Sequence, residues 1–239
     1  MGSLSSIPDP LMKSLIFALT LFPLGLMAEE GFVSIFNGKD LTGWSSKPGA
    51  WEVRNGEIWC TGASAERNWL IWEGGEPADF VLRLEFRWDN GNSGVNVRSI
   101  DQGKWQAYGY QVEIAQQNKM GLWHHSLLNR EHPKREERHL MALAGQTVRL
   151  SKEGKKTMVQ EGNGEIIKAL YTDLEWNTME IIAKGDTLVQ KINGVVFSMV
   201  TDLDEEMSTK AGVLALQDHG KGCIVAFRKL RLMTLSEEG

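Results

Sequence analysis

The sequence is poor in cysteine and proline and has no excess of basic residues. It contains two Cys and six Pro, and its 26 Lys and Arg are outnumbered by 31 Asp and Glu. The two cysteines show no Cys/His zinc-binding spacing. A net charge of −5 argues against nucleic acid as a partner, because nucleic-acid binding needs a basic face. The P-loop, the dinucleotide-binding fingerprint and the Gly-x-Ser-x-Gly nucleophile elbow are also missing.

Long hydrophobic runs are absent except near the N-terminus. Lys13 precedes an apolar run over 15–28, and two glutamates follow it. This run is shorter than the about 20 residues that cross a bilayer. Its pattern is typical of a secretory signal peptide, with an uncleaved anchor as the alternative. We therefore predict a leader and signal peptide over 1–28 and one domain over 29–239. The protein would be secreted or periplasmic, without stable membrane insertion after cleavage.

A sustained helical period is also absent, and period-two alternation takes its place. Over 80–88, apolar side chains alternate with mostly charged ones, which is typical of a half-buried strand. Asn55-Gly56 and Asn193-Gly194 each lie between two strand-like runs and predict tight hairpins. The best helical candidate, 131–143, contains Pro133 and is expected to form a loop or a short surface helix. The patterns predict one all-β domain whose last strand, 224–235, pairs near the first.

Two strand-like runs within 88–116 have an apolar side and a polar side. Because successive side chains of a strand point to opposite faces, the valines and Ile114 of these runs can enter a core. The other side then carries a carboxylate, a cation and two amides, which pack poorly but suit a polar ligand. Its members are Asn96, Arg98, Gln111 and Glu113.

Eight short motifs in sequence order together resemble the 3-keto-disaccharide hydrolase domain family of exported bacterial proteins. They are FNGKDLTGW (36–44), WEVRNGEI (51–58), ADFVLRLEFR (78–87), NSGVNVR (92–98), GYQVEI (109–114), WNTMEIIAKGD (176–186), KINGV (191–195) and LQDHG with VAFRKLRL (216–232). The resemblance implies a concanavalin A-like jelly-roll sandwich of two antiparallel sheets. It also implies cleavage of 3-keto-glycosides by C2 proton abstraction, β-elimination and hydration, with a divalent metal ion in some members. The partner would be a carbohydrate.

The implied chemistry needs a base, a donor at the keto oxygen and a proton source. Glu113 is the candidate base or metal ligand, Arg98 the candidate oxyanion donor, and His219 the candidate proton donor or metal ligand. Arg98 could equally be a structural ion-pair partner. Trp105 and Trp123 lie in loops beside the polar side and could stack on a sugar. The resemblance adds substrate-binding roles for Asn92, Ser93, Gln111 and Gln217, although 92–94 could simply form a turn.

The sequence departs from the family pattern after the GYQVEI motif. Ala115 and the pair His124-His125 stand where relatives carry acidic residues, and 126–145 match nothing in the pattern. Either a metal site uses Glu113 with His124 or His125 and His219, or the chemistry is altered or lost. In the second case the chain would be a non-catalytic glycan-binding module.

The two cysteines, Cys60 and Cys223, both lie in apolar, strand-like surroundings. Export would permit a disulfide between them. Buried free thiols are also common in such surroundings, so both states stay open.

Overall fold

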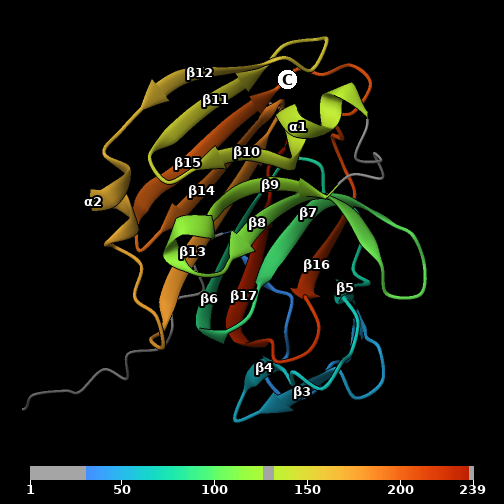
Figure 1. Cartoon of the computed structure of the whole chain (residues 1–239). Helices are drawn as coiled ribbons and strands as arrows, with labels where there is room; N and C mark the ends of the chain where they lie inside the picture. The colour runs from blue at the N-terminus through green and yellow to red at the C-terminus, as the bar shows by residue number, and fades with distance from the viewer. Residues whose placement is uncertain (1–30, 126–131, 237–239) are drawn as a thin grey trace, which may run out of the picture. The chain divides into compact units, whose positions relative to one another are not determined.

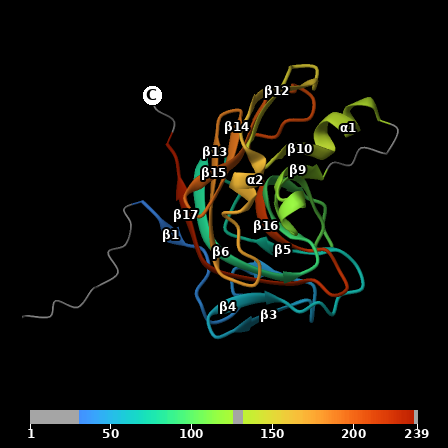
Figure 2. The same ribbon diagram turned by 60° about the vertical axis from the view of Figure 1, so that its left-hand side comes forward.

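Two stacked β-sheets make up the computed structural model, which describes residues 31–125 and 132–236 (Figures 1 and 2). From Gly31 onward the chain forms one unit. The first sheet has ten strands in the order β12-β11-β15-β14-β13-β6-β17-β4-β3, with β1 also paired to β17. These strands are β1 (Val33–Ser34), β3 (Trp51–Arg54), β4 (Glu57–Cys60), β6 (Phe80–Asn90), β11 (Gln146–Leu150), β12 (Lys156–Glu161), β13 (Asn177–Lys184), β14 (Thr187–Ile192), β15 (Val195–Asp202) and β17 (Ile224–Thr234).

The second sheet has seven strands in the order β10-β9-β8-β7-β16-β5-β2, and Figure 1 shows most of them side by side. They are β2 (Trp44–Ser45), β5 (Asn68–Trp72), β7 (Ser93–Asp101), β8 (Ala107–Ile114), β9 (Gly121–His125), β10 (Leu140–Leu143) and β16 (Val213–Asp218). All strand pairs are antiparallel except β11 and β15, which run parallel. The expected all-β jelly-roll sandwich is therefore confirmed, with one parallel pair in an otherwise antiparallel structure.

Alternating burial fixes the inner faces of the sheets. In β6, Leu82, Leu84 and Phe86 are buried while Arg83 and Glu85 between them are half-buried, as the alternation predicts. These apolar side chains join residues from both sheets, Val95 and Ile114 among them, in one hydrophobic core. The core lies between the sheets, so the outer face of each sheet is left for other tasks.

The predicted hairpins occur where the Asn-Gly pairs stand. Asn55 and Gly56 have φ of 51° and 80° between β3 and β4, and Asn193 and Gly194 have 50° and 82° between β14 and β15. Positive φ at both central residues matches the right-handed twist of the flanking strands. The predicted last strand is also confirmed, because β17 pairs with both β1 and β6.

Within 31–125 and 132–236, three short helices connect the strands: η1 (Gln117–Lys119), α1 (Pro133–His139) and α2 (Gly164–Lys168). The ring of His132 caps α1 by accepting from the Lys134 amide, and Asn163 caps α2 in the same way through the Ile166 amide. The candidate helix over 131–143 is therefore a two-turn helix followed by β10.

The signal peptide expected over 1–28 lies outside the described residues. Among the residues that are described, no helix is long and apolar enough to cross a membrane.

Candidate functional site

Two rows of cross-strand neighbours build a polar surface on the outer side of the seven-stranded sheet. One row runs Trp69, Gln217, Gly94, Glu113 across β5, β16, β7 and β8. The next row runs Ile71, Ala215, Asn96, Gln111, Trp123 and reaches β9. Directly opposed residues in neighbouring strands share a face, so these nine residues form one surface, called the polar face below.

Hydrogen bonds of a side-chain amide connect the residues at the centre of the polar face. The Gln111 Nε2 donates to Glu113 Oε2 at 2.7 Å and to Gln217 Oε1 at 3.0 Å. Gly94 lies under this amide, and a Cβ at Gly94 would come within 2.5 Å of Gln111 Nε2. The glycine therefore lets the Gln111 side chain lie flat across β7. The Gln111 Oε1 and Gln217 Nε2 atoms are buried without a partner among the described residues, which leaves both able to bind a ligand.

Glu113 is the buried acid of this surface, with a residue exposure of 6%. Burial penalises the carboxylate and raises the pKa of Glu113 to about 8, although the Gln111 hydrogen bond and the Lys119 charge act in the opposite direction. A carboxyl group with a pKa near neutrality can both take and give a proton at physiological pH. Glu113 thus has the electrostatic character of a general base or acid.

Imidazole and cationic groups border the polar face. Burial lowers the pKa of His125 to about 4, and the charges of His139, Arg67 and His219 add to this effect. Burial also lowers the pKa of His219, helped by the charges of Arg67 and Lys119. The Lys119 charge thus acts on both Glu113 and His219. A hollow of about 240 Å³ beside His125 is lined also by Tyr108 and Met207.

The tryptophans of the surface have different roles. Trp123 is half-buried on the polar face, donates from Nε1 to the Lys119 carbonyl at 2.9 Å, and meets the His139 ring edge-on at 5.2 Å. Trp105 lies in the β7–β8 loop, where its carbonyl accepts from the Trp69 amide at 2.9 Å. The sequence analysis missed Trp69, which is buried and donates from Nε1 to Asn96 Oδ1 at 2.8 Å.

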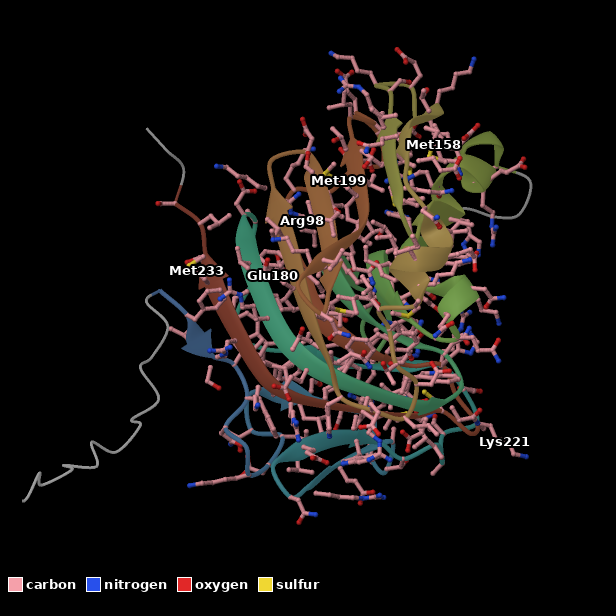
Figure 3. The ribbon with its side chains drawn as sticks, turned by 90° about the vertical axis from the view of Figure 1, so that its left-hand side faces the viewer. Arg98, Met158, Glu180, Met199, Lys221 and Met233 are labelled. Carbon is pink, nitrogen blue, oxygen red and sulfur yellow. The ribbon has the colours of Figure 1, made fainter. Side chains whose placement is uncertain are left out.

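Arg98 does not join this surface, so its predicted place beside Glu113 is wrong. A β-bulge interrupts β7 between Val97 and Ile100, and Arg98 adopts φ +45° there. The bulge breaks the alternation. The guanidinium instead donates to the Ala78 and Gly185 carbonyls and to Asp79 Oδ1, each at 2.7 Å. Figure 3 shows Arg98 by strands β13 and β14, consistent with a structural ion-pair role.

His124 and Ser93 also point away from the polar face, in contrast to their predicted roles. His124 is opposite Tyr110, on the core side of β9, and packs edge-on against that ring at 5.0 Å. The Ser93 hydroxyl is buried and donates to the Gln217 carbonyl at 2.6 Å, so it joins strands β7 and β16. Asn92 precedes β7, and its carbonyl accepts from the Cys223 thiol at 3.1 Å.

The predicted metal set of Glu113, His124 and His219 is therefore not assembled. His124 lies on the core side, while Glu113 is on the outer side of the same sheet. Of the described residues, the one group of three or more potential ligands comprises Cys60, Asp218 and Cys223, which is elsewhere.

Residues of the border that the sequence analysis missed are Arg67, Lys119 and His139. Arg67 precedes β5, and its carbonyl accepts from the Gln106 side chain of the β7–β8 loop at 2.9 Å. Lys119 belongs to η1 and His139 ends α1, in segments with no strand periodicity. A period-two pattern identifies the floor of such a surface but carries no information about its border.

The fold and the site together define a β-sandwich protein with a tryptophan-bordered polar surface around one buried acid. The model of the 3-keto-alpha-glucoside-1,2-lyase-like domain matches residues 31–233, and the chain belongs to this family. The suspected family is thus confirmed, and with it a carbohydrate-related role.

Solved structures share the fold. Two candidate glycosyl hydrolases from Parabacteroides distasonis are similar, with TM-scores of 0.55 and 0.53 and identities of 17% and 16%. The matches cover 85% and 87% of this chain and 99% and 95% of theirs. The potassium-bound carbohydrate recognition domain of Emp46p has a TM-score of 0.50 at 9% identity, over 82% of this chain and 91% of its own. None of the curated proteins compared with the chain matches it.

Proposed function

We propose that the protein cleaves 3-keto-glycosides by proton abstraction at C2, elimination at C1 and hydration of the product. The observation that carries this proposal is Glu113, a buried carboxyl group whose pKa is about 8 and which is held by Gln111 in the centre of the polar face. A 3-keto group acidifies the C2 proton, so a single well-placed base can start the reaction. The family match supports the same chemistry.

In the first step, ionised Glu113 takes the C2 proton, and the electron pair of the C–H bond forms an enediolate with the C3 oxygen. We assign Lys119 to the negative charge on that oxygen, because its backbone carbonyl is bonded to Trp123 of the polar face and its charge acts on Glu113. This assignment replaces Arg98, whose guanidinium is bonded elsewhere.

In the second step, the enediolate collapses, the C1–O bond breaks, and the leaving oxygen takes the proton from Glu113. In the third, water adds its oxygen to C1 of the unsaturated ketone, and its proton reaches C2. We assign His219 to this water, as its proton carrier. Gln217 Nε2 and Gln111 Oε1, both buried without a partner in the described part of the chain, suit sugar hydroxyls.

The decisive experiment is Glu113→Gln with a 3-keto-disaccharide as substrate. Removing the base should lower kcat by about 10²–10⁴-fold. The substrate should still bind, because the amide keeps the shape of the side chain. The matched control is Glu76→Gln, which removes an exposed carboxylate before β6 and should leave kcat unchanged. Full activity in Glu113→Gln would show that another group is the base.

A non-catalytic glycan-binding module is the second candidate. It is favoured by Trp123, which is half-buried on the polar face where a sugar ring could stack. Saturable binding of the same disaccharide by the wild-type protein without product, in chelator and again with added divalent metal, would establish this function. Product formation in either condition would exclude it.

A further inference from the structure

A cluster of two thiols and a carboxyl group lies on the core side of the seven-stranded sheet. Cys60 ends β4, Asp218 ends β16, and Cys223 precedes β17. All three residues are buried, and their sulfur and carboxyl oxygen atoms lie within 4.8 Å of one another. Asp218 is opposite Ser93 in the sheet, so it points away from the polar face that holds Gln217. The cluster is therefore separate from the proposed catalytic site.

The Asp218 carboxyl group has no cationic partner among residues 31–125 and 132–236. Its exposure is 0%, and its hydrogen bonds come from neutral donors, the Asn68 amide at 2.9 Å and the Gly220 backbone at 2.8 Å. A buried carboxylate is costly unless an ion pair or a metal ion compensates its charge. The two hydrogen bonds fix the orientation of the group, as outer-shell donors do for a metal-binding carboxylate.

The two thiols are not bonded to each other in this structure. The Cys60 Sγ donates to the Cys223 carbonyl at 3.3 Å, and the Cys223 Sγ donates to the Asn92 carbonyl at 3.1 Å. A disulfide would join the sulfurs but would leave the Asp218 charge uncompensated. A cation bound by all three groups would satisfy the carboxylate and both sulfurs together.

We infer that Cys60, Asp218 and Cys223 supply three ligands of a binding site for a divalent, thiophilic metal ion, for which zinc is the best match. Zinc binds sulfur at about 2.3 Å and carboxylate oxygen at about 2.0–2.2 Å in tetrahedral sites. The three ligand atoms need only a small contraction toward a common centre. Both thiols lose their protons to solvent on binding. The ion would join β4, β16 and the start of β17, next to the residues that hold Gln217.

Zinc content and thiol state test the site directly. The full chain, purified without chelator, should contain about one zinc per molecule by elemental analysis. Cobalt(II) exchanged into the protein should give thiolate-to-metal charge-transfer absorption. Denatured with chelator, the chain should expose both thiols to a thiol reagent without prior reduction. A chain with no stoichiometric metal and no cobalt spectrum, or one whose thiols appear only after reduction, would overturn the site in favour of free thiols or a disulfide.

Two variants separate coordination from folding. Asp218→Asn removes a ligand charge and should abolish stoichiometric zinc. Asn68→Ala removes the outer-shell donor, together with the acceptor of the Trp51 Nε1 hydrogen bond, and keeps all three ligands. It should weaken zinc affinity about 10–100-fold. The matched control is Asp101→Asn, an exposed aspartate in the same sheet, which should keep wild-type affinity. Equal zinc binding by Asp218→Asn and the control would contradict the assignment. Zinc binding can be measured whether or not the protein is active.

Discussion

Glu113 is an acid whose surroundings favour its protonated form. Its carboxyl group is buried and accepts from a neutral amide, and Lys119 acts on it only as a distant charge. Burial without a close cation raises the pKa, whereas Glu85, with Lys229 and Arg228 as partners, has its pKa lowered. The pKa values of two glutamates in one sandwich are thus shifted in opposite directions, because only Glu85 has cationic partners.

The raised pKa of Glu113 predicts how stability depends on pH. Between pH 4.5 and about 8 the folded chain keeps this proton and the unfolded chain loses it, so the free energy of unfolding falls as pH rises. Glu113→Gln should lack this part of the decline, whereas Glu76→Gln should keep it. Denaturant unfolding across this pH range measures the difference. Parallel curves for the wild type and Glu113→Gln would show that Glu113 has an ordinary pKa.

Gly94 gives a second prediction, about how the base is held. A Cβ in Gly94→Ala would displace the Gln111 amide and remove a hydrogen bond that lowers the Glu113 pKa. We expect kcat/KM to fall by about 10²-fold and the rise of the pH–rate profile to move to higher pH. Gly103→Ala, at an exposed turn with φ +74° and no atom within 4 Å of the added Cβ, controls for a loss of stability alone, because its backbone strain lies away from Gln111. An unshifted pH–rate profile in Gly94→Ala would show that the Gln111 amide does not influence the pKa of Glu113.

Helix α1 presents His139 to the polar face because its other side is anchored in the core. Arg138, with 0% exposure, donates to Asp202 Oδ2 at 2.7 Å and to Asp204 Oδ2 at 3.3 Å. Asp202 also accepts from the Tyr110 hydroxyl at 2.6 Å. The network ties α1 to the end of β15 and to β8, and Figure 2 shows α1 beside β9 and β10. A two-turn helix is too short to be stable alone, so this anchor determines its position.

Breaking that anchor should therefore destabilise the whole fold. Arg138→Met leaves the buried Asp202 carboxylate without its cation, whereas Asp204 keeps the Lys134 ammonium at 3.0 Å. Removing one partner of such a buried pair costs about 3–5 kcal/mol. Arg135→Ala, a half-buried position of the same helix, should cost much less and controls for helix propensity. Urea unfolding of both variants measures the difference. A cost for Arg138→Met no larger than that for Arg135→Ala would mean that the network contributes nothing.

Sequence periodicity predicts the regular strands but not the irregular positions within them. The alternation of β8 correctly placed Gln111 and Glu113 on one face, because β8 is regular from Tyr110 to Ile114 where it pairs with β7. The same reasoning failed for Arg98, since the bulge of β7 has no signature in a period-two pattern. The buried ion pairs of Arg138 could not be predicted either, because its partners lie 64 and 66 residues away, at a strand end and in a loop.

At the scale of the whole molecule, Arg98 connects the two sheets. It belongs to β7 of the seven-stranded sheet, while its partners precede β6 and lie in the β13–β14 turn of the ten-stranded sheet. The Thr209 hydroxyl donates to its carbonyl at 2.7 Å, which adds the segment before β16. The family motif that contains Arg98 thus includes a residue that holds the sandwich together.

Arg98→Met distinguishes a scaffold role from a catalytic one. It leaves Asp79 and two carbonyls without their shared donor, and we expect a loss of stability on the order of 3 kcal/mol, because Asp79 is partly solvated. Arg98→Lys should recover only part of this, since an ammonium cannot replace three donors fixed in one plane. Below the unfolding transition, kcat/KM per folded molecule should stay near the wild-type value in both variants. A fall of kcat/KM with stability retained would instead show that Arg98 contacts the reacting sugar.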